Sequence, residues 1–220
     1  MNCERAKLQM QGVGGRSLRA KPSVNDEQIR YHLKRNLRTL YSKDPETVIL
    51  DELGLRHGYS RIDVVVVNGS LHGYEIKSDR DTFRRLARQA DTYNSVLDFV
   101  TLVTGQRHAG QALAAIPEWW GIQLAEPVRR VGMRFIHVRK PSENPAPDKL
   151  SIAKLLWREE ALDFLEELGA AAGLQSKPRR LIYSRLAEVA DIGCLRERVR
   201  IRLKSRKDWR SGAQPLSCGD

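Results

Sequence analysis

The sequence of 220 residues lacks the long hydrophobic run of roughly 20 residues that a membrane-spanning helix needs. Its first 21 residues contain basic side chains but no apolar stretch of the kind that a secretory signal requires. We therefore expect a cytoplasmic protein that does not associate with membranes.

Cysteine is also scarce, with Cys3, Cys194 and Cys218 far apart in the sequence. An odd number of distant cysteines is typical neither of a disulfide framework nor of a zinc site with thiolate ligands. The sequence also lacks internal repeats and low-complexity tracts. These absences leave an ordinary globular protein, which 41% hydrophobic and 30% charged residues also indicate.

Positive charge is what the chain has in excess, with a formal net charge of +11. Such an excess favours polyanionic partners, because binding a polyanion releases condensed counterions. The excess is concentrated between Arg196 and Arg210, where eight Lys and Arg residues face only Glu197 and Asp208. A nucleic acid is therefore one candidate partner, although a solvated surface of a soluble protein would have the same composition.

Periodicity predicts a mixed α/β core followed by helices. A helix begins near Asp26 with Asn25 as its cap, and apolar strand-like runs alternate with helical patterns after it. The expected strands are 47–50, 62–67, 71–77, 99–103, 121–124 and 134–138, and the expected helices between them are 79–97 and 108–116. Ser78 and Asp81 fit a capping box for the first of these two helices.

The C-terminal part reads as helical throughout. One helix spans 152–168, a second is capped by Ser176 with Pro178 in its first turn, and a third follows Asp191. The third segment alternates like a strand from Arg198 to Lys204, but the longer helical spacing favours a helix. We expect a flexible arm (1–23), a core (24–140), a Pro-rich linker (141–150), a basic helical region (151–210) and a disordered tail (211–220).

A predicted hairpin places two carboxylates side by side. If Asn68, Gly69 and Ser70 form a three-residue loop with Gly69 left-handed, Val67 pairs with Leu71. Asp63 then lies opposite Glu75 on one face, with Lys77 two residues further along. A two-residue loop would move Asp63 to the other face.

This arrangement predicts metal-assisted chemistry. Two adjacent carboxylates repel each other unless a cation lies between them, and oxygen ligands without cysteine favour Mg²⁺ or Mn²⁺. A lysine beside them can orient a water or stabilise charge on a phosphate. The alternative is that Asp63 and Glu75 are surface residues paired with Arg61 and Lys77.

Asp63 followed by Glu75-Ile76-Lys77 resembles the D…(D/E)xK motif of the PD-(D/E)XK nuclease superfamily, and Gln89 and Tyr93 are similar to its RecB-like QxxxY motif. The run from Asp51 to Tyr93 also resembles a largely uncharacterised bacterial family assigned to that superfamily. The resemblance implies a restriction-endonuclease-like core with a central mixed sheet flanked by helices. It also implies metal ligands from Glu52, Asp63, Glu75 and the Ile76 carbonyl, with Lys77 assisting the attacking water.

We therefore expect a metal-dependent nuclease that acts on DNA, as a homodimer or with a partner protein. A non-cleaving binding module with a nuclease fold and a partner-dependent nuclease subunit remain the alternatives. Gln89 and Tyr93 either contact substrate or form a buried polar pair satisfied by the backbone. The candidate nucleic-acid contacts are Arg84, Arg88, Lys177, Arg179, Arg180, Arg200 and Lys204, although a solvated helix face explains Arg84 and Arg88 equally well.

Overall fold

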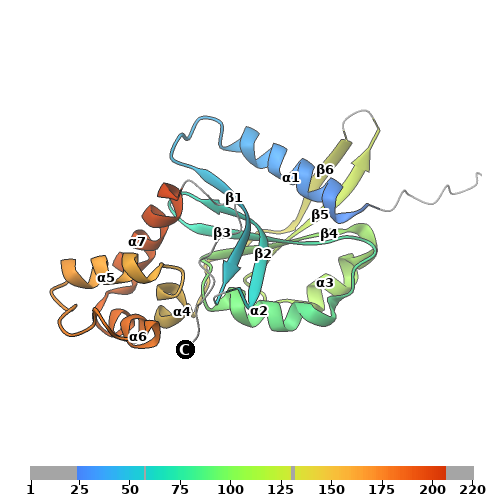
Figure 1. Ribbon diagram of the computed structural model, residues 1–220. Coiled ribbons are helices and arrows are strands. Elements are labelled where there is room, and N and C mark those ends of the chain that lie inside the picture. The colour runs from blue at the N-terminus through green and yellow to red at the C-terminus, as the bar shows by residue number, and fades with distance from the viewer. Residues whose placement is uncertain (1–23, 57, 130–131, 207–220) are drawn as a thin grey trace, which may run out of the picture.

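The computed structural model describes residues 24–56, 58–129 and 132–206. The expected N-terminal arm and C-terminal tail lie outside these residues. Within them the chain is a mixed α/β protein built on an open six-stranded sheet with helices on both faces (Figure 1). No helix in the described part of the chain is long and apolar enough to cross a membrane.

The strands follow one another across the sheet in the order of the sequence. The first three pair antiparallel, the next two join in parallel, and the last pairs antiparallel. The strands are β1 (Val48–Leu55), β2 (Ser60–Val67), β3 (Leu71–Lys77), β4 (Phe99–Gly105), β5 (Gly121–Val128) and β6 (Gly132–Arg139). All six strands predicted from the sequence are present, and β1 runs five residues further than expected.

Each face of the sheet buries a different set of helices. Helix α1 (Asp26–Leu40) covers one face, because its stripe of Ile29, Leu33 and Leu37 packs against side chains of β2, β3 and β4. Helices α2 (Leu86–Asn94) and α3 (Ala109–Ala115) cover the other face (Figure 1). Asn25 caps α1 as predicted, accepting a hydrogen bond from the Gln28 backbone N–H at 2.8 Å.

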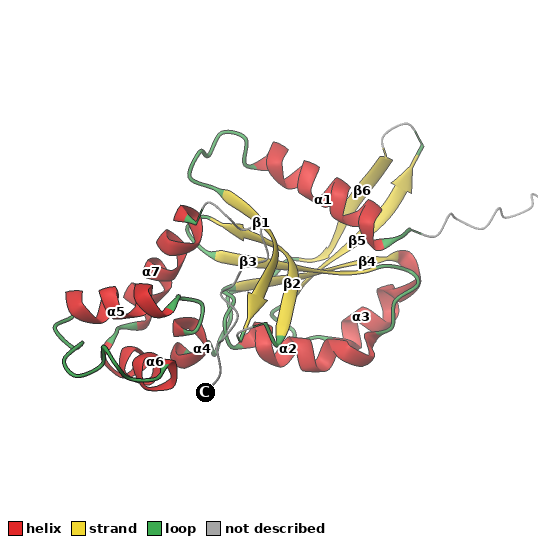
Figure 2. Ribbon diagram, viewed as in Figure 1, coloured by secondary structure: helices red, strands yellow, loops and turns green. Residues whose placement is uncertain are grey.

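Four helices follow the sheet and form the body shown at its side in Figure 2. They are α4 (Lys149–Ala153), α5 (Arg158–Glu167), α6 (Arg179–Val189) and α7 (Ile192–Ser205). Their apolar side chains belong to the same buried cluster as the α2 face of the sheet. The helical region therefore completes the core of the sheet instead of standing apart from it.

Three predicted helix boundaries were wrong, each because extended backbone interrupts the pattern. The Ser78–Asp81 hydrogen bonds form, but Thr82 is extended, so only a 3₁₀ turn η1 (Phe83–Arg85) precedes α2. The single helix expected over 152–168 is divided at Trp157, which is extended and begins α5. Pro178 is the extended N-cap of α6, so Ser176 does not cap this helix.

The other uncertain segment, α7, is a helix as predicted, and the Asp191 side chain accepts from the Gly193 and Cys194 backbone N–H groups. The hairpin between β2 and β3 has the predicted register, with Val67 opposite Leu71. Gly69, however, does not have a positive φ. The turn is closed instead by Asn68, whose side chain accepts the Ser70 backbone N–H at 3.1 Å.

The Pro-rich segment after β6 is hydrogen-bonded to segments that flank the sheet strands. Backbone hydrogen bonds join Ser142 to Trp119, Asn144 to Asp98 and Asp148 to Ser95. The buried Asn144 amide also donates to the carbonyls of Asn94 at 2.7 Å and Leu97 at 2.8 Å. The Asn144 side chain therefore pairs with two backbone carbonyls at and just after the end of α2. These hydrogen bonds anchor the segment that leads from the sheet to the helical region.

Replacing Asn144 with Ala is expected to lower the free energy of unfolding by about 2–3 kcal/mol, because buried carbonyls lose their donor. Denaturant unfolding of the variant beside Asn36→Ala, a change at an exposed position of α1, measures the effect. Equal stability of the two variants would show that Asn144 does not anchor the crossing.

Candidate functional site

The site lies where β2 and β3 separate. Their pairing is described from Val67 opposite Leu71 to Val64 opposite Tyr74. Beyond that point the Asp63 carboxylate accepts the Ile76 backbone N–H at 2.8 Å through Oδ2. A side chain thus takes the place of a strand partner at this end of the hairpin.

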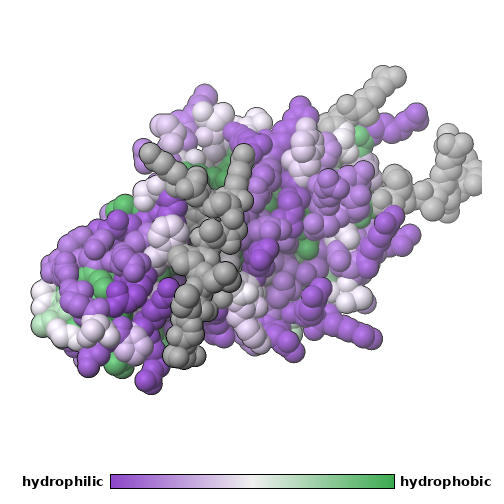
Figure 3. Space-filling view, in the orientation of Figure 1, coloured by the Kyte–Doolittle hydropathy of each residue, from purple (hydrophilic) through white to green (hydrophobic). Residues whose placement is uncertain are grey.

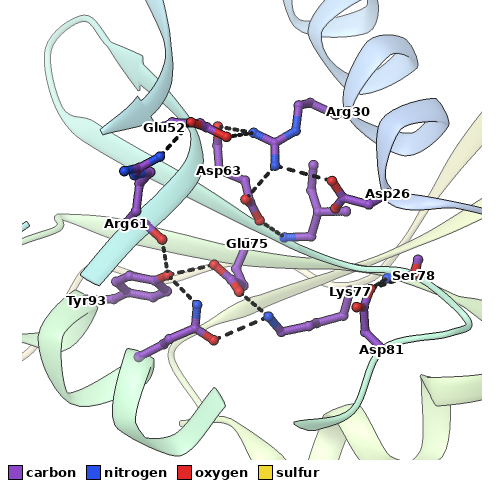
Figure 4. Close-up of polar contacts among 12 residues, drawn as sticks. Asp26, Arg30, Glu52, Arg61, Asp63, Glu75, Lys77, Ser78, Asp81 and Tyr93 are labelled. Carbon is purple, nitrogen blue, oxygen red and sulfur yellow. Dashed lines mark hydrogen bonds and ion pairs between the residues drawn. The ribbon is translucent and has the colours of Figure 1, made fainter. Parts of the chain in front are cut away.

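The strand register is as predicted, but the carboxylates of Asp63 and Glu75 bind groups on different sides of the sheet. Asp63 turns toward Arg30 of α1, and Glu75 turns toward Tyr93 of α2 (Figure 4). The prediction that the two side chains share a face is therefore corrected. The separation of β2 and β3 explains the difference, because regular alternation ends where the strand pairing ends.

Glu75 is 1% exposed and is held by two donors. The Tyr93 hydroxyl donates to its Oε2 at 2.7 Å, and the Lys77 ammonium donates to its Oε1. Burial raises the pKa of the Glu75 carboxyl, the charge of Asp63 raises it further, and Lys77 and Tyr93 lower it. The net direction is upward, so the buried acid retains its proton more readily than an ordinary glutamic acid.

Gln89 completes a closed ring of polar contacts with Glu75, Lys77 and Tyr93. Its amide oxygen accepts from the Lys77 ammonium at 3.3 Å, and its amide nitrogen donates to the Tyr93 hydroxyl at 3.1 Å. Tyr93 is fully buried and also contacts the Arg61 carbonyl at 2.8 Å. The prediction that Gln89 and Tyr93 point from α2 toward the sheet is confirmed.

Arg30 of α1 is the residue that the sequence reasoning missed. Its guanidinium lies among three carboxylates, at 2.7 Å from Asp63, 3.3 Å from Asp26 and 3.7 Å from Glu52. It also donates to the Asp63 backbone carbonyl at 3.1 Å. The i, i+4 spacing of Asp26 and Arg30 was the available signal, but nothing local to α1 indicates the contacts with β1 and β2.

Glu52 lies apart from Glu75. Its side chain is 51% exposed and pairs with Arg61 at 2.9 Å as well as with Arg30. Its φ of 52° is a left-handed conformation that costs free energy in a residue with a side chain. Arg61 was expected to pair with Asp63 if the carboxylates were surface residues, and it pairs with Glu52 instead.

The carboxylates predicted to bind a metal instead contact two positively charged side chains of the protein, Arg30 and Lys77. Glu52 and Asp63 contact Arg30, Glu75 contacts Lys77, and the described contact of Ile76 is its backbone N–H. Within residues 24–56, 58–129 and 132–206, no three His, Cys, Asp or Glu side chains form a metal cluster. Burial raises the pKa of Asp63, against opposing contributions from Ile76 and Arg30.

The predicted nucleic-acid contacts have two kinds of environment. Arg84, Arg88, Lys177 and Arg180 are exposed, whereas Arg179, Arg200 and Lys204 are partly buried. Lys204 lies 3.7 Å from Glu46. Much of the basic run on α7 is used within the fold, because Arg196, Arg198, Arg202 and Arg206 each pair with an acidic side chain.

Glu75→Gln is expected to change how stability depends on pH. Because folding raises the pKa of Glu75 above about 4.5, native stability falls as pH rises through that value and the folded-state pKa. The variant lacks this loss, so its free energy of unfolding relative to the native protein should improve as the pH rises above about 4.5. Denaturant unfolding across this pH range measures the difference, and a constant difference would contradict the raised pKa.

Comparison with known proteins identifies a family that this chain matches. A family model described as Bacteriophage P4 protein cII matches residues 22–213. Protein cII of Enterobacteria phage P4 is 25% identical over 169 residues, which cover 76% of this chain and 63% of that protein, so this chain spans less than two thirds of its relative. A protein of unknown function from Silicibacter pomeroyi has a TM-score of 0.40 and 20% identity over 66% of this chain and 94% of its own, a likeness too low to support an argument. From the match over residues 22–213, this chain belongs to the bacteriophage P4 protein cII family.

Proposed function

We propose that the chain is a metal-dependent nuclease of the PD-(D/E)XK type that hydrolyses phosphodiester bonds in DNA. The observation that carries this proposal is the Glu75–Lys77 pair at the end of β3, enclosed by Gln89 and Tyr93 of α2. Glu75 is a buried acid with a raised pKa beside an ammonium, and perturbed groups of this kind concentrate at functional sites.

The order of the elements supports the same proposal. Helix α1, the antiparallel strands β1, β2 and β3, helix α2 and the parallel strand β4 follow each other along the chain. This is the helix, three strands, helix and strand order that a restriction-endonuclease-like core requires. Glu75 and Lys77 lie at the end of β3, and Asp63 lies in the neighbouring strand β2.

To hold a divalent cation together with Glu75, the Asp63 side chain would have to leave Arg30 and turn toward Glu75. The carboxylates of Asp63 and Glu75 are hard oxygen ligands, each has a raised pKa, and the charge of Asp63 contributes to that of Glu75. A cation between them would remove this repulsion, as Arg30 and Lys77 do from the two outer sides. When bound, Mg²⁺ or Mn²⁺ would polarise a phosphate oxygen and lower the pKa of a water.

The side chains around Glu75 then have separate tasks. Tyr93 fixes one carboxylate oxygen by its hydroxyl, and Gln89 fixes both Tyr93 and Lys77. The Lys77 ammonium is held by Glu75 and Gln89, and we assign it the task of orienting a water or stabilising charge on a phosphate. The ring therefore keeps the reacting groups in place before a substrate arrives.

A non-cleaving DNA-binding module is the second candidate. The ion pairs of Arg30 with Asp63 and of Lys77 with Glu75 favour it, because they neutralise both carboxylates without a metal. In this case the ring would stabilise the fold and the basic surface would bind DNA. A nuclease that is active only with a partner protein would use the same site residues as the first candidate.

Metal-dependent cleavage is the direct test. Purified protein incubated with linear, circular and branched DNA in Mn²⁺ or Mg²⁺ should cut, and the Glu75→Gln and Lys77→Ala variants should lose activity by at least about a hundredfold. Asp51→Asn, an exposed strand acid paired with Lys34, is the matched control and should cut normally. No cleavage of any substrate would favour the binding module, whereas cleavage that survives Glu75→Gln would show that Glu75 does not belong to the active site.

Metal affinity tests the role of Arg30 in the donor set. Arg30→Gln removes the guanidinium from Asp63 and should strengthen Mn²⁺ binding by about tenfold, because the cation no longer competes. Calorimetry and the rise in Tm on adding Mn²⁺ measure the effect, with Lys34→Gln on the same helix as control. Binding that is unchanged by Arg30→Gln would show that Asp63 is not a ligand.

A further inference from the structure

Five exposed arginines lie on and beside the start of α2. Arg80 precedes η1, Arg84 and Arg85 lie in η1, Arg88 lies in α2, and Arg107 lies in the turn η2 (Gln106–His108) before α3. In the part of the chain that the structure describes, none of their guanidinium groups has an ion pair or hydrogen bond. We call these five residues the basic ridge.

The ridge contrasts with the positive charge of α7. Arg196, Arg198 and Arg202 on that helix are paired with Asp98, Glu167 and Asp163 respectively. A guanidinium that is already paired with a carboxylate has less to gain from a phosphate, because binding the phosphate first breaks the existing pair. Among the described residues, the ridge therefore offers a polyanion more unpaired arginines than α7 does.

Local geometry turns the ridge outward. Leu86, Ala90 and Tyr93 are buried on α2, whereas Arg88 of the same helix and Arg84 of the preceding turn η1 are exposed. Two nearby acids accept hydrogen bonds from the chain itself: Asp81 accepts from Ser78, and Asp79 accepts from the backbone N–H groups of Val24 and Arg107. Figure 3 shows a largely hydrophilic surface over α2 and α3.

Two contacts make the ridge one surface and connect it to the candidate site. The Phe83 and His108 rings lie 5.0 Å apart, and the Asp79 carboxylate is 3.3 Å from the Arg107 backbone nitrogen, so η2 lies beside η1. Arg85 precedes Gln89 by one helical turn, and Gln89 accepts from Lys77. The ridge therefore adjoins the helix that carries Gln89 and Tyr93 of the candidate site.

We propose that the basic ridge binds the sugar–phosphate backbone of DNA and directs it to the Glu75–Lys77 site. The proposal rests on the proposed function for the choice of DNA and deepens it by naming the surface that holds the substrate. Unpaired guanidinium groups recognise phosphate oxygens through charge-assisted hydrogen bonds, and each neutralised phosphate releases counterions. Binding along this surface is consequently independent of base sequence.

The test measures binding without cleavage. A short fluorescein-labelled DNA duplex is titrated in EDTA with the native protein, with the double variant Arg84→Gln, Arg88→Gln, and with a control double variant Arg35→Gln, Arg38→Gln. The control removes the same charge from exposed positions on α1, which covers the opposite face of the sheet. Fluorescence anisotropy at several salt concentrations gives both the affinity and its salt dependence.

The ridge variant is expected to bind about tenfold more weakly, with a salt slope smaller by about 1.8, or about 0.9 for each lost phosphate contact. The control should bind as the native protein does. An equal loss in the control, unchanged binding by the ridge variant, or no binding by the native protein would overturn the proposal. A matching RNA duplex that binds more tightly than the DNA would overturn the choice of DNA.

Cleavage assays separate this failure from failure of the proposed function. If the native protein cuts DNA with Mn²⁺ and the ridge variant binds and cuts equally well, the ridge inference fails and the nuclease stands. If the ridge variant loses binding but neither protein cuts, the ridge inference stands and the nuclease fails.

Discussion

The buried carboxylate of Glu75 sets the arrangement of the layer between the sheet and α2. Removing such a group from water is costly unless donors replace the water, and here a lysine from the same strand and a tyrosine from α2 do so. Gln89 joins the two donors, so the helix can shift on the sheet only by breaking several polar contacts at once. Leu86 and Ala90 of the same helix belong to the buried apolar cluster, so both polar and apolar contacts hold α2 on the sheet.

A second charged layer connects the other face of the sheet to the same strands. Arg30 joins α1 to β1 and β2 through Glu52 and Asp63, and the left-handed backbone at Glu52 is part of that arrangement. Asp63 in turn accepts a hydrogen bond from the Ile76 backbone N–H at the point where β2 and β3 separate. Side-chain contacts on both faces of the sheet therefore stabilise the separation of these strands, which does not depend on the hairpin turn alone.

Sequence reasoning found what depends on local spacing. The register of β2 and β3 followed from the length of the turn, and the inward direction of Gln89 and Tyr93 followed from their place on an amphipathic helix. It did not find Arg30, whose main partners are about 20 to 30 positions away in sequence. It also overestimated the free charge of α7, because the acids that neutralise those arginines come from α5 and from residues around Asp98. Helix starts after extended residues such as Thr82 were missed, since the apolar pattern does not record backbone angles.

The continuous core has a consequence for how relatives of this chain can diverge. Trp120 from the sheet and Val199 from α7 belong to one buried cluster, and the family match over residues 22–213 includes both regions. Recombination that joined the sheet of one relative to the terminal helices of another would therefore bring together surfaces that had not evolved against each other. Changes of specificity are therefore expected to arise by substitution on exposed surfaces instead of by exchange of modules.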